Sequence, residues 1–223
     1  MKGLFITSTG TEIGKTLVTA TLCHQLKSSG KAVAALKPII SGVTDDTMQG
    51  SDTALIAESL DLPLNLEVIN RISPFRYKAP LAPTMAAALE GRTLDYEDLI
   101  RACRIAMAEN QFTLVEGVGG SFVPLVGDKL VADWIKDLGL ESLLVVGSYL
   151  GTISHTIATL EAMTARGLPV RAIVISESGG DNPDLAKTTE EIERLTGLRV
   201  AVIPRLSSAF APWASAPDLA HLI

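Results

Sequence analysis

One short stretch decides the fold of this chain: Gly10-Thr11-Glu12-Ile13-Gly14-Lys15-Thr16. An apolar run, Gly3-Leu4-Phe5-Ile6-Thr7, precedes it, and residues 15–29 follow it with apolar side chains at helical spacing. A strand, a glycine-bearing loop and a helix that opens on Gly-Lys-Thr form a phosphate-binding loop, whose backbone N–H groups face an anion. Such a loop predicts that Lys15 reaches the outer phosphates and that the Thr16 hydroxyl holds Mg²⁺.

The match to the standard loop is irregular. Thr9 stands where the signature has its first glycine, and Gly10 comes one position later. This change indicates a variant family rather than a Ras-like or helicase-like nucleotidase. The alternative is a glycine-rich turn with an exposed Lys15, but the strand before the loop and the helix after it favour a phosphate site.

Composition limits what the chain can be. Its 223 residues are 47% hydrophobic and carry a formal net charge of −6, which argues against nucleic acid as the main partner. No linker, charge block or repeat divides the chain, so residues 1–223 are expected to form one domain. Cys23 and Cys103 lack metal-ligand or redox spacing, which predicts core residues of a reduced, cytoplasmic protein. No apolar run reaches the length of a signal peptide or a membrane span.

Strands and helices alternate along the sequence. Residues 63–79 are the least regular part, where Val68-Ile69 and Ile72 suggest a short extended piece. Apolar runs predict strands at 3–7, 32–36, 112–116, 142–147, 170–175 and 200–203. Helices are predicted at 15–29, 53–57, 84–89, 95–109, 131–138, 154–166 and 183–196, with a short one after Pro217. Because the strands are continuous apolar runs, we expect an α/β fold, a P-loop NTPase-like three-layer sandwich with a mainly parallel central sheet.

Several of these strands end in a polar residue or a loop at the same edge of the predicted sheet. Ligands bind outside the carboxyl ends of the strands in such sheets. We therefore expect one site at this edge, formed by the phosphate loop, Lys37, Glu116 and the loops after Gly147 and Ile175.

Three polar residues near this edge each fit two roles. Glu116 could bind Mg²⁺ beside Thr16, or it could be a solvated acid next to a tight turn. Asp52 could be a further Mg²⁺ ligand, or it could cap the helix that starts at Thr53. Lys37 could reach solvent at the rim of the sheet. A lysine that ends a buried strand is costly unless it meets an anion, however, so Lys37 would place a second ammonium group on a transferring phosphoryl group.

Taken together, these residues resemble the dethiobiotin synthetase family, whose reaction is the penultimate step of biotin synthesis. The resemblance covers nearly the whole chain. The element Lys37-Pro38-Ile39-Ile40-Ser41-Gly42 separates this family from its relatives. The other matching pieces are Thr9–Thr16, Ser51-Asp52, Ala79-Pro80-Leu81-Ala82-Pro83, Val115–Gly120, Leu150–His155 and Val202-Ile203-Pro204.

The resemblance implies a reaction. An amine of 7,8-diaminononanoate takes up CO₂ and forms a carbamate, which ATP phosphorylates to a carbamic-phosphoric anhydride. The second amine then closes the cyclic urea and releases phosphate. The resemblance therefore implies an ATP-dependent cyclo-ligase with ATP as co-substrate, Mg²⁺ as cofactor, and no nucleic acid or membrane partner.

The resemblance also implies roles for individual residues. Lys37 and Lys15 would be catalytic, by stabilising charge on the carbamate and the γ-phosphate. The implied Mg²⁺ ligands are Thr16, Asp52 and Glu116, which favours the metal role of Asp52, although Asp52 could cap its helix as well. The implied contacts to the diamine or its carbamate come from Thr11, Lys37, Ser41, Leu150 and Ser154. The implied nucleotide site comprises Glu12, Ile13, Gly14, Lys15, Thr16, Leu17, Asp52, Glu116, Gly117, Val118, Gly119, Ser176, Glu177, Pro204, Arg205 and Leu206.

A homodimer with active sites at the subunit interface is also implied, with the loop 150–154 approaching the substrate carboxylate of the neighbouring subunit. Two positions depart from the family pattern. Ser154 stands where many relatives have Asn, so the carboxylate contact would depend more on backbone N–H groups at a helix N-terminus. Ser176-Glu177 replaces an Asn that reads adenine in many relatives. Since a serine hydroxyl cannot make the bidentate amide contact, weaker selectivity for adenine is expected.

Two other classes of protein share such a loop. ParA/MinD-type partition and septum-site ATPases are nucleotide-switched dimers, and they usually carry an extra lysine early in the loop, which residues 9–12 do not supply. Amide-forming ligases of cobalamin or nucleotide synthesis normally add a glutaminase domain, for which 223 residues leave too little room. The ParA/MinD-type switch is the main alternative function.

Overall fold

The computed structural model describes residues 3–44, 46–206 and 210–223. The polar stretch 44–51 predicts a turn, and its position 45 lies outside the described residues. Within these ranges, six strands form one parallel sheet in the order β10-β9-β8-β1-β5-β2. Each of the six strands predicted from long apolar runs is present to within one residue at each end, which confirms the α/β fold with a mainly parallel central sheet. The strands are β1 Gly3–Ser8, β2 Val33–Leu36, β5 Phe112–Glu116, β8 Ser142–Val146, β9 Val170–Ser176 and β10 Val200–Ile203.

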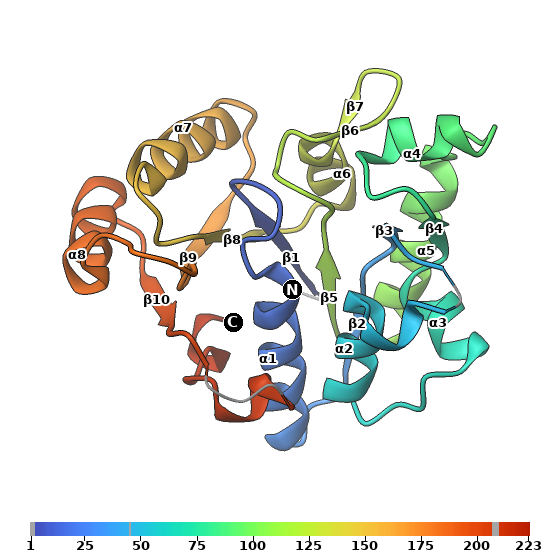
Figure 1. Cartoon of the computed structure of the whole chain (residues 1–223), viewed down its shortest axis with the longest axis horizontal. Coiled ribbons are helices and arrows are strands. Elements are labelled where there is room, and N and C mark those ends of the chain that lie inside the picture. Colours follow the sequence, from blue (N-terminus) through green and yellow to red (C-terminus); the bar gives the residue numbers. More distant parts are fainter. Residues whose placement is uncertain (1–2, 45, 207–209) are drawn as a thin grey trace.

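Helices cover both faces of this sheet, as Figure 1 shows. One face packs against α1 (Lys15–Ser28), α2 (Asp52–Ser59) and α3 (Leu66–Ile72). The helices on the other face are α4 Pro83–Leu89, α5 Tyr96–Glu109, α6 Val131–Leu138, α7 Thr152–Ala165 and α8 Leu185–Thr196. In the described part of the chain, none of these helices is long and apolar enough to cross a membrane.

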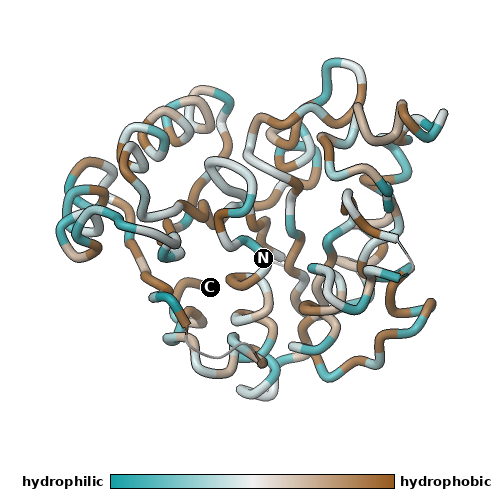
Figure 2. Tube along the Cα trace, viewed as in Figure 1, coloured by the Kyte–Doolittle hydropathy of each residue, from teal (hydrophilic) through white to brown (hydrophobic). Residues whose placement is uncertain are grey.

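The alternation of side chains along β1 explains the two layers. Leu4 and Ile6 belong to the cluster with α1, whereas Phe5 points to the other face and packs edge-on against Trp134 of α6, with ring centroids 4.9 Å apart. All four side chains are fully buried. Figure 2 shows hydrophobic stretches along the central strands. A strand buried on both faces needs apolar residues at every position, which is why the sequence pattern identified these strands.

The predicted extended piece at Val68-Ile69 and Ile72 is wrong, because these residues lie in helix α3. The Asn65 side chain accepts a hydrogen bond from the Val68 backbone N–H at 2.9 Å and so caps the helix. Val68 and Ile72, four positions apart, are the buried residues of α3. Val68, Ile69 and Ile72 are β-branched and common in strands, but the Asn65 cap and the helical spacing of the buried residues stabilise a helix.

Four short strands were not predicted. A proline cannot donate to a strand ladder, so Pro38 predicts the end of pairing, yet β3 (Ile39–Ser41) follows it directly and pairs in parallel with β4 (Phe75–Tyr77) outside the main sheet. The strands β6 (Pro124–Val126) and β7 (Lys129–Leu130) form an antiparallel hairpin. The short helix predicted after Pro217 is a 3₁₀ turn at Ala220–Leu222. Two further 3₁₀ turns among the described residues lie at Met48–Gly50 and Pro212–Ser215.

Both cysteines are expected to resist alkylation in the folded protein. Cys23 and Cys103 are buried free thiols, and burial raises the pKa of each to about 12. Because the thiolate is the reacting form, iodoacetamide at pH 8 should label neither residue in native protein and both in guanidinium. Mass spectrometry of the two samples checks this. Equal labelling with and without guanidinium would contradict the buried placement.

Candidate active site

The phosphate loop joins the end of β1 to the start of α1. Gly14 has φ +90°, a conformation that side-chain-bearing residues rarely adopt. A Cβ at this position would also lie 2.3 Å from the Ser176 Oγ. Glycine is therefore required where the chain turns into α1, so that Lys15 and Thr16 begin the helix at the carboxyl edge of the sheet.

A second glycine-bearing segment, residues 117–120 after β5, holds the phosphate loop in place. The Ser8 hydroxyl donates to the carbonyl oxygens of Gly10 at 2.5 Å and Gly119 at 3.1 Å. A Cβ on Gly120 would lie 3.3 Å from backbone atoms of residues 8–10, so the two segments pack backbone to backbone. Sequence reasoning missed Ser8, because no motif position marks it.

These segments border a cavity of about 740 Å³. Lys15 and Lys37 both line it, so the two ammonium groups that the sequence placed at one edge share one cavity. The other predicted residues that line it are Thr11, Glu12, Ile13, Gly14, Thr16, Leu17, Ser41, Asp52, Val118 and Gly119. Residues that were not predicted also line it: Ile40, Leu55, Pro80, Leu81, Ala82, Pro83 and Val123. Four of these residues belong to the stretch 79–83, which matches the family pattern, and the structure places them at the site.

Lys37 lies among three oxygen-bearing side chains, Thr16, Asp52 and Glu116, which we call the oxygen cage. Its Nζ donates to the Glu116 Oε1 at 2.7 Å, forms an ion pair with the Asp52 carboxylate, and lies 3.4 Å from the Thr16 Oγ1. The Thr16 hydroxyl in turn donates to the same Glu116 oxygen at 2.7 Å. Lys37 is 6% exposed and Glu116 is fully buried. Neither the rim lysine nor the solvated acid considered from the sequence is therefore present.

The two lysines differ in their electrostatic surroundings. Burial would lower the pKa of Lys37, but the carboxylates of Glu116 and Asp52 outweigh it and raise that pKa. Burial lowers the pKa of Lys15 to about 8, and Lys37 contributes in the same direction. The Lys15 Nζ donates to the Ser8 Oγ at 3.1 Å and to the Gly10 carbonyl at 3.2 Å. Lys37 is thus fixed by anions, whereas Lys15 is held by neutral acceptors and can accept an anion.

Asp52 does not cap its helix. The cap is Ser51, whose hydroxyl oxygen accepts a hydrogen bond from the Ala54 N–H at 3.3 Å. Asp52 is the first residue of α2, and its side chain is directed to Lys37 instead. Ser and Asp are both favoured caps, so the sequence alone could not decide between adjacent positions.

The oxygen cage has the chemistry of a magnesium site. The Glu116 Oε2 is buried and has no hydrogen-bond partner among the described residues. Mg²⁺ is usually bound by one or two carboxylates together with substrate phosphates and water. Within the described ranges, no three His, Cys, Asp or Glu side chains gather as a metal site. The oxygen cage has two carboxylates and one hydroxyl, so further ligands of a metal ion would come from the nucleotide and water. The residues present fit Mg²⁺ bound together with a nucleotide.

The remaining predicted site residues lie outside this cavity. Glu116 and Gly117 do not line it, and Ser176 ends β9 with its Oγ against Gly14. The Glu177 carboxylate accepts a hydrogen bond from the Arg205 N–H at 2.6 Å, which joins the segment after β9 to Pro204-Arg205-Leu206 after β10. Leu150 is 87% exposed, and neither it nor Ser154 lines the cavity. Helix α7 begins at Thr152, two residues before the predicted start.

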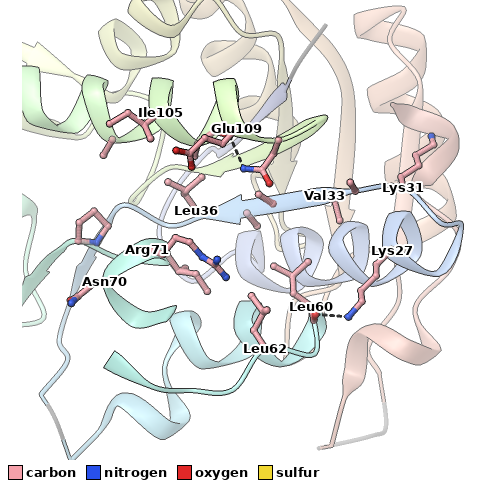
Figure 3. A pocket seen from close by; sticks show the side chains of 18 residues that line it. Lys27, Lys31, Val33, Leu36, Leu60, Leu62, Asn70, Arg71, Ile105 and Glu109 are labelled. Carbon is pink, nitrogen blue, oxygen red and sulfur yellow. Dashed lines mark hydrogen bonds between the residues drawn. The ribbon is translucent and has the colours of Figure 1, made fainter. Parts of the chain in front are cut away.

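A second cavity, of about 700 Å³, lies along β2 at the open edge of the sheet (Figure 3). Apolar side chains such as Leu36, Leu60 and Ile105 form much of its wall, with Lys27 at one end. It shares no lining residue with the cavity at the phosphate loop. We therefore place the reaction in the cavity at the phosphate loop, where the phosphate loop, Lys37 and Asp52 lie.

Comparison with known proteins gives close relatives. The AAA domain family AAA_26 matches residues 2–212. The ATP-dependent dethiobiotin synthetase BioD of Methylobacterium nodulans is 43% identical over 211 residues, covering 92% of this chain and 94% of the relative. BioD of Caulobacter vibrioides is 45% identical over 190 residues, and BioD of Bacillus subtilis 168 is 38% identical over 211 residues. The Caulobacter match covers 84% of this chain and 85% of the relative. The Bacillus match covers 93% of this chain and 89% of the relative.

Solved structures agree on the fold. A ParA family ATPase from Chlorobium tepidum superposes with a TM-score of 0.55 at 19% identity, covering 92% of this chain and 85% of that one. The MinC:MinD complex from Aquifex aeolicus gives a TM-score of 0.58 at 13% identity, covering 96% and 85%. At such identities the likeness shows a shared P-loop NTPase-like fold and nothing about a shared function.

Proposed function

The chain belongs to the family of ATP-dependent dethiobiotin synthetases, and we propose that it performs their ligase reaction in the cavity at the phosphate loop. The supporting observation is that Lys15, Lys37 and Asp52 line one cavity, where Lys37 pairs with Asp52 and with the buried carboxylate of Glu116. The family assignment favours the synthetase over the nucleotide-switched ATPase considered from the sequence, because it rests on relatives of 43% and 45% identity, whereas the likeness to the ParA and MinD structures concerns the fold alone. We further propose that residues 1–223 act as one synthetase domain.

The proposed reaction has three steps. One amine of 7,8-diaminononanoate adds to CO₂, loses a proton and becomes a carbamate. A carbamate oxygen attacks the γ-phosphorus of ATP, and ADP leaves. The second amine attacks the carbonyl carbon of the resulting anhydride, and phosphate leaves as the cyclic urea closes. Phosphoryl transfer needs positioning and charge stabilisation above all, so groups that hold both oxyanions carry most of the catalysis.

The lysines supply this stabilisation in the proposal. Lys15 starts α1, so its ammonium group and the helix N-terminus act on the β- and γ-phosphates together. Lys37 directly follows β2, lines the same cavity, and acts on the carbamate and the transferring phosphoryl group. Thr11 and Ser41 line the same cavity and hydrogen-bond the diamine or its carbamate.

We propose Thr16, Asp52 and Glu116 as the residues that hold Mg²⁺ when MgATP binds. The metal neutralises charge on the β- and γ-phosphates when bound. We also propose that two copies of the chain associate, because exposed Leu150 and Ser154 lie outside their own cavity and would contact the substrate carboxylate of a partner. The N-terminus of α7 favours such a carboxylate.

Selectivity for adenine is expected to be weak. Ser176 ends β9 and Glu177 follows it, but the Ser176 hydroxyl lies against Gly14 and the Glu177 carboxylate accepts a hydrogen bond from the Arg205 backbone N–H. Neither side chain offers the amide edge that pairs with adenine. A bidentate contact to a base contributes up to about a hundredfold in selectivity, and this contact is missing here. Values of kcat/KM for ATP, GTP and CTP should therefore differ by less than about a hundredfold. A larger preference for ATP would show that other groups read the base.

The proposed function is tested by product formation. Purified protein is given MgATP with or without diaminononanoate and bicarbonate, and dethiobiotin and ADP are measured by mass spectrometry. Both products should require the diamine and bicarbonate together. ATP turnover that ignores the diamine, with no dethiobiotin, would refute the assignment.

A further inference from the structure

Lys37 is held in place by the three side chains that are proposed to hold the metal. Its Nζ lies 2.7 Å from the Glu116 Oε1 and 3.4 Å from the Thr16 Oγ1, and it forms an ion pair with Asp52. The three partners come from α1, α2 and β5, which are separate parts of the fold. An ammonium group therefore lies at the centre of the oxygen cage.

The Lys37 ammonium group and a metal ion would compete for the same oxygen atoms, so each would bind more weakly in the presence of the other. The Glu116 Oε1 already accepts hydrogen bonds from both Lys37 and Thr16. Like charges at such short range in a buried site repel strongly. Glu116 is fully buried, so water cannot screen the repulsion well.

We infer that Lys37 acts as a resident counter-ion of the oxygen cage and is displaced from it into the cavity when Mg²⁺ enters with the nucleotide. This inference rests on the proposed metal role of the cage. Lys37 in its resting position neutralises a buried carboxylate that would otherwise be unpaired. Once displaced, its ammonium group enters the cavity that Thr11 and Ser41 line, where the carbamate and γ-phosphate are proposed to meet. The catalytic cation would thus be released only when the nucleotide is present.

Lys15 provides an internal comparison. It lines the same cavity and carries the same charge, but its Nζ hydrogen bonds go to Ser8 and the Gly10 carbonyl rather than to the cage. Removal of either lysine weakens the general repulsion of a metal ion. Only removal of Lys37 also frees the oxygen atoms of Thr16, Asp52 and Glu116 from an ammonium group.

The exchange is tested first by Mn²⁺ binding without nucleotide, followed by the electron paramagnetic resonance signal of free Mn²⁺. Lys37→Met should tighten Mn²⁺ binding by at least about tenfold, whereas Lys15→Met should tighten it by about threefold or less, because its charge lies outside the cage. Thermal melts of both variants establish that they are folded. Equal changes in the two variants, or no change for Lys37→Met, would overturn the exchange.

A crystal structure of the wild-type protein with Mg²⁺ and ADP tests the same inference without any substitution. With metal in the cage, the Lys37 Nζ should lie more than about 4 Å from both carboxylates, beyond ion-pair range. Metal in the cage with Lys37 still bonded to Glu116 would overturn the exchange and leave the synthetase assignment intact. A cage that stays metal-free would overturn both the exchange and the proposed metal ligands, while dethiobiotin formation tests the function separately.

Discussion

Replacement of Lys37 by methionine is expected to lower kcat for dethiobiotin formation by about a hundredfold or more. The loss follows from the removal of one preorganised charge that stabilises the developing phosphoryl and carbamate oxyanions. The KM for ATP should change much less, because Lys15 and the N-terminus of α1 still bind the phosphates. Steady-state kinetics with saturating diamine and bicarbonate give both constants.

The matched control is Lys27→Met. Lys27 also forms an ion pair, with Asp61, but both side chains reach solvent, and Lys27 lies at the second cavity, away from the phosphate loop. Exposed pairs contribute little to stability, so this variant should keep kcat within about twofold of the parent. If Lys37→Met also stayed within a few-fold, Lys37 would be a structural residue of the sheet edge and not a catalytic one.

Replacement of Glu116 by glutamine is expected to affect both stability and metal use. The buried Lys37 ammonium would keep only the partly exposed Asp52 carboxylate, so the metal-free protein should lose about 3 kcal/mol of unfolding free energy. The Mg²⁺ concentration for half-maximal turnover should rise by at least about tenfold, since a charged ligand becomes neutral. Urea denaturation and a Mg²⁺ titration of turnover measure the two effects.

Asp61→Asn is the control for Glu116→Gln. It removes one carboxylate from an exposed ion pair, and its cost should stay within about 0.5 kcal/mol with an unchanged Mg²⁺ requirement. A Glu116→Gln variant with the parent's Mg²⁺ requirement would remove Glu116 from the set of metal ligands.

The sequence predicted the main sheet well because its strands are buried on both faces. Such strands are continuous apolar runs, and the polar residues at their carboxyl ends mark the site, as for Lys37 and Glu116. The same logic failed where burial is one-sided or the pieces are short. The sequence of α3 suggests a short extended piece, and the two-residue strand β7 carries too few residues to show any period.

Details of the site depend on contacts between distant segments, and the sequence could not predict these. The hydrogen bond from Ser8 to Gly119 and the contact of Ser176 with Gly14 join residues far apart in the chain. The pairing of Lys37 with its own proposed metal ligands is of the same kind. The sequence indicates that cations and carboxylates converge, but only the structure shows which of them are in contact.

The most direct test of the central claim follows oxygen during one turnover. If the carbamate attacks ATP, a carbamate oxygen leaves with the phosphate when the ring closes. Reaction with ¹⁸O-labelled CO₂ in ordinary water, stopped before the label exchanges, should therefore give inorganic phosphate that carries one ¹⁸O atom per dethiobiotin formed. Phosphate with oxygen from water alone would contradict phosphoryl transfer to a carbamate at this site.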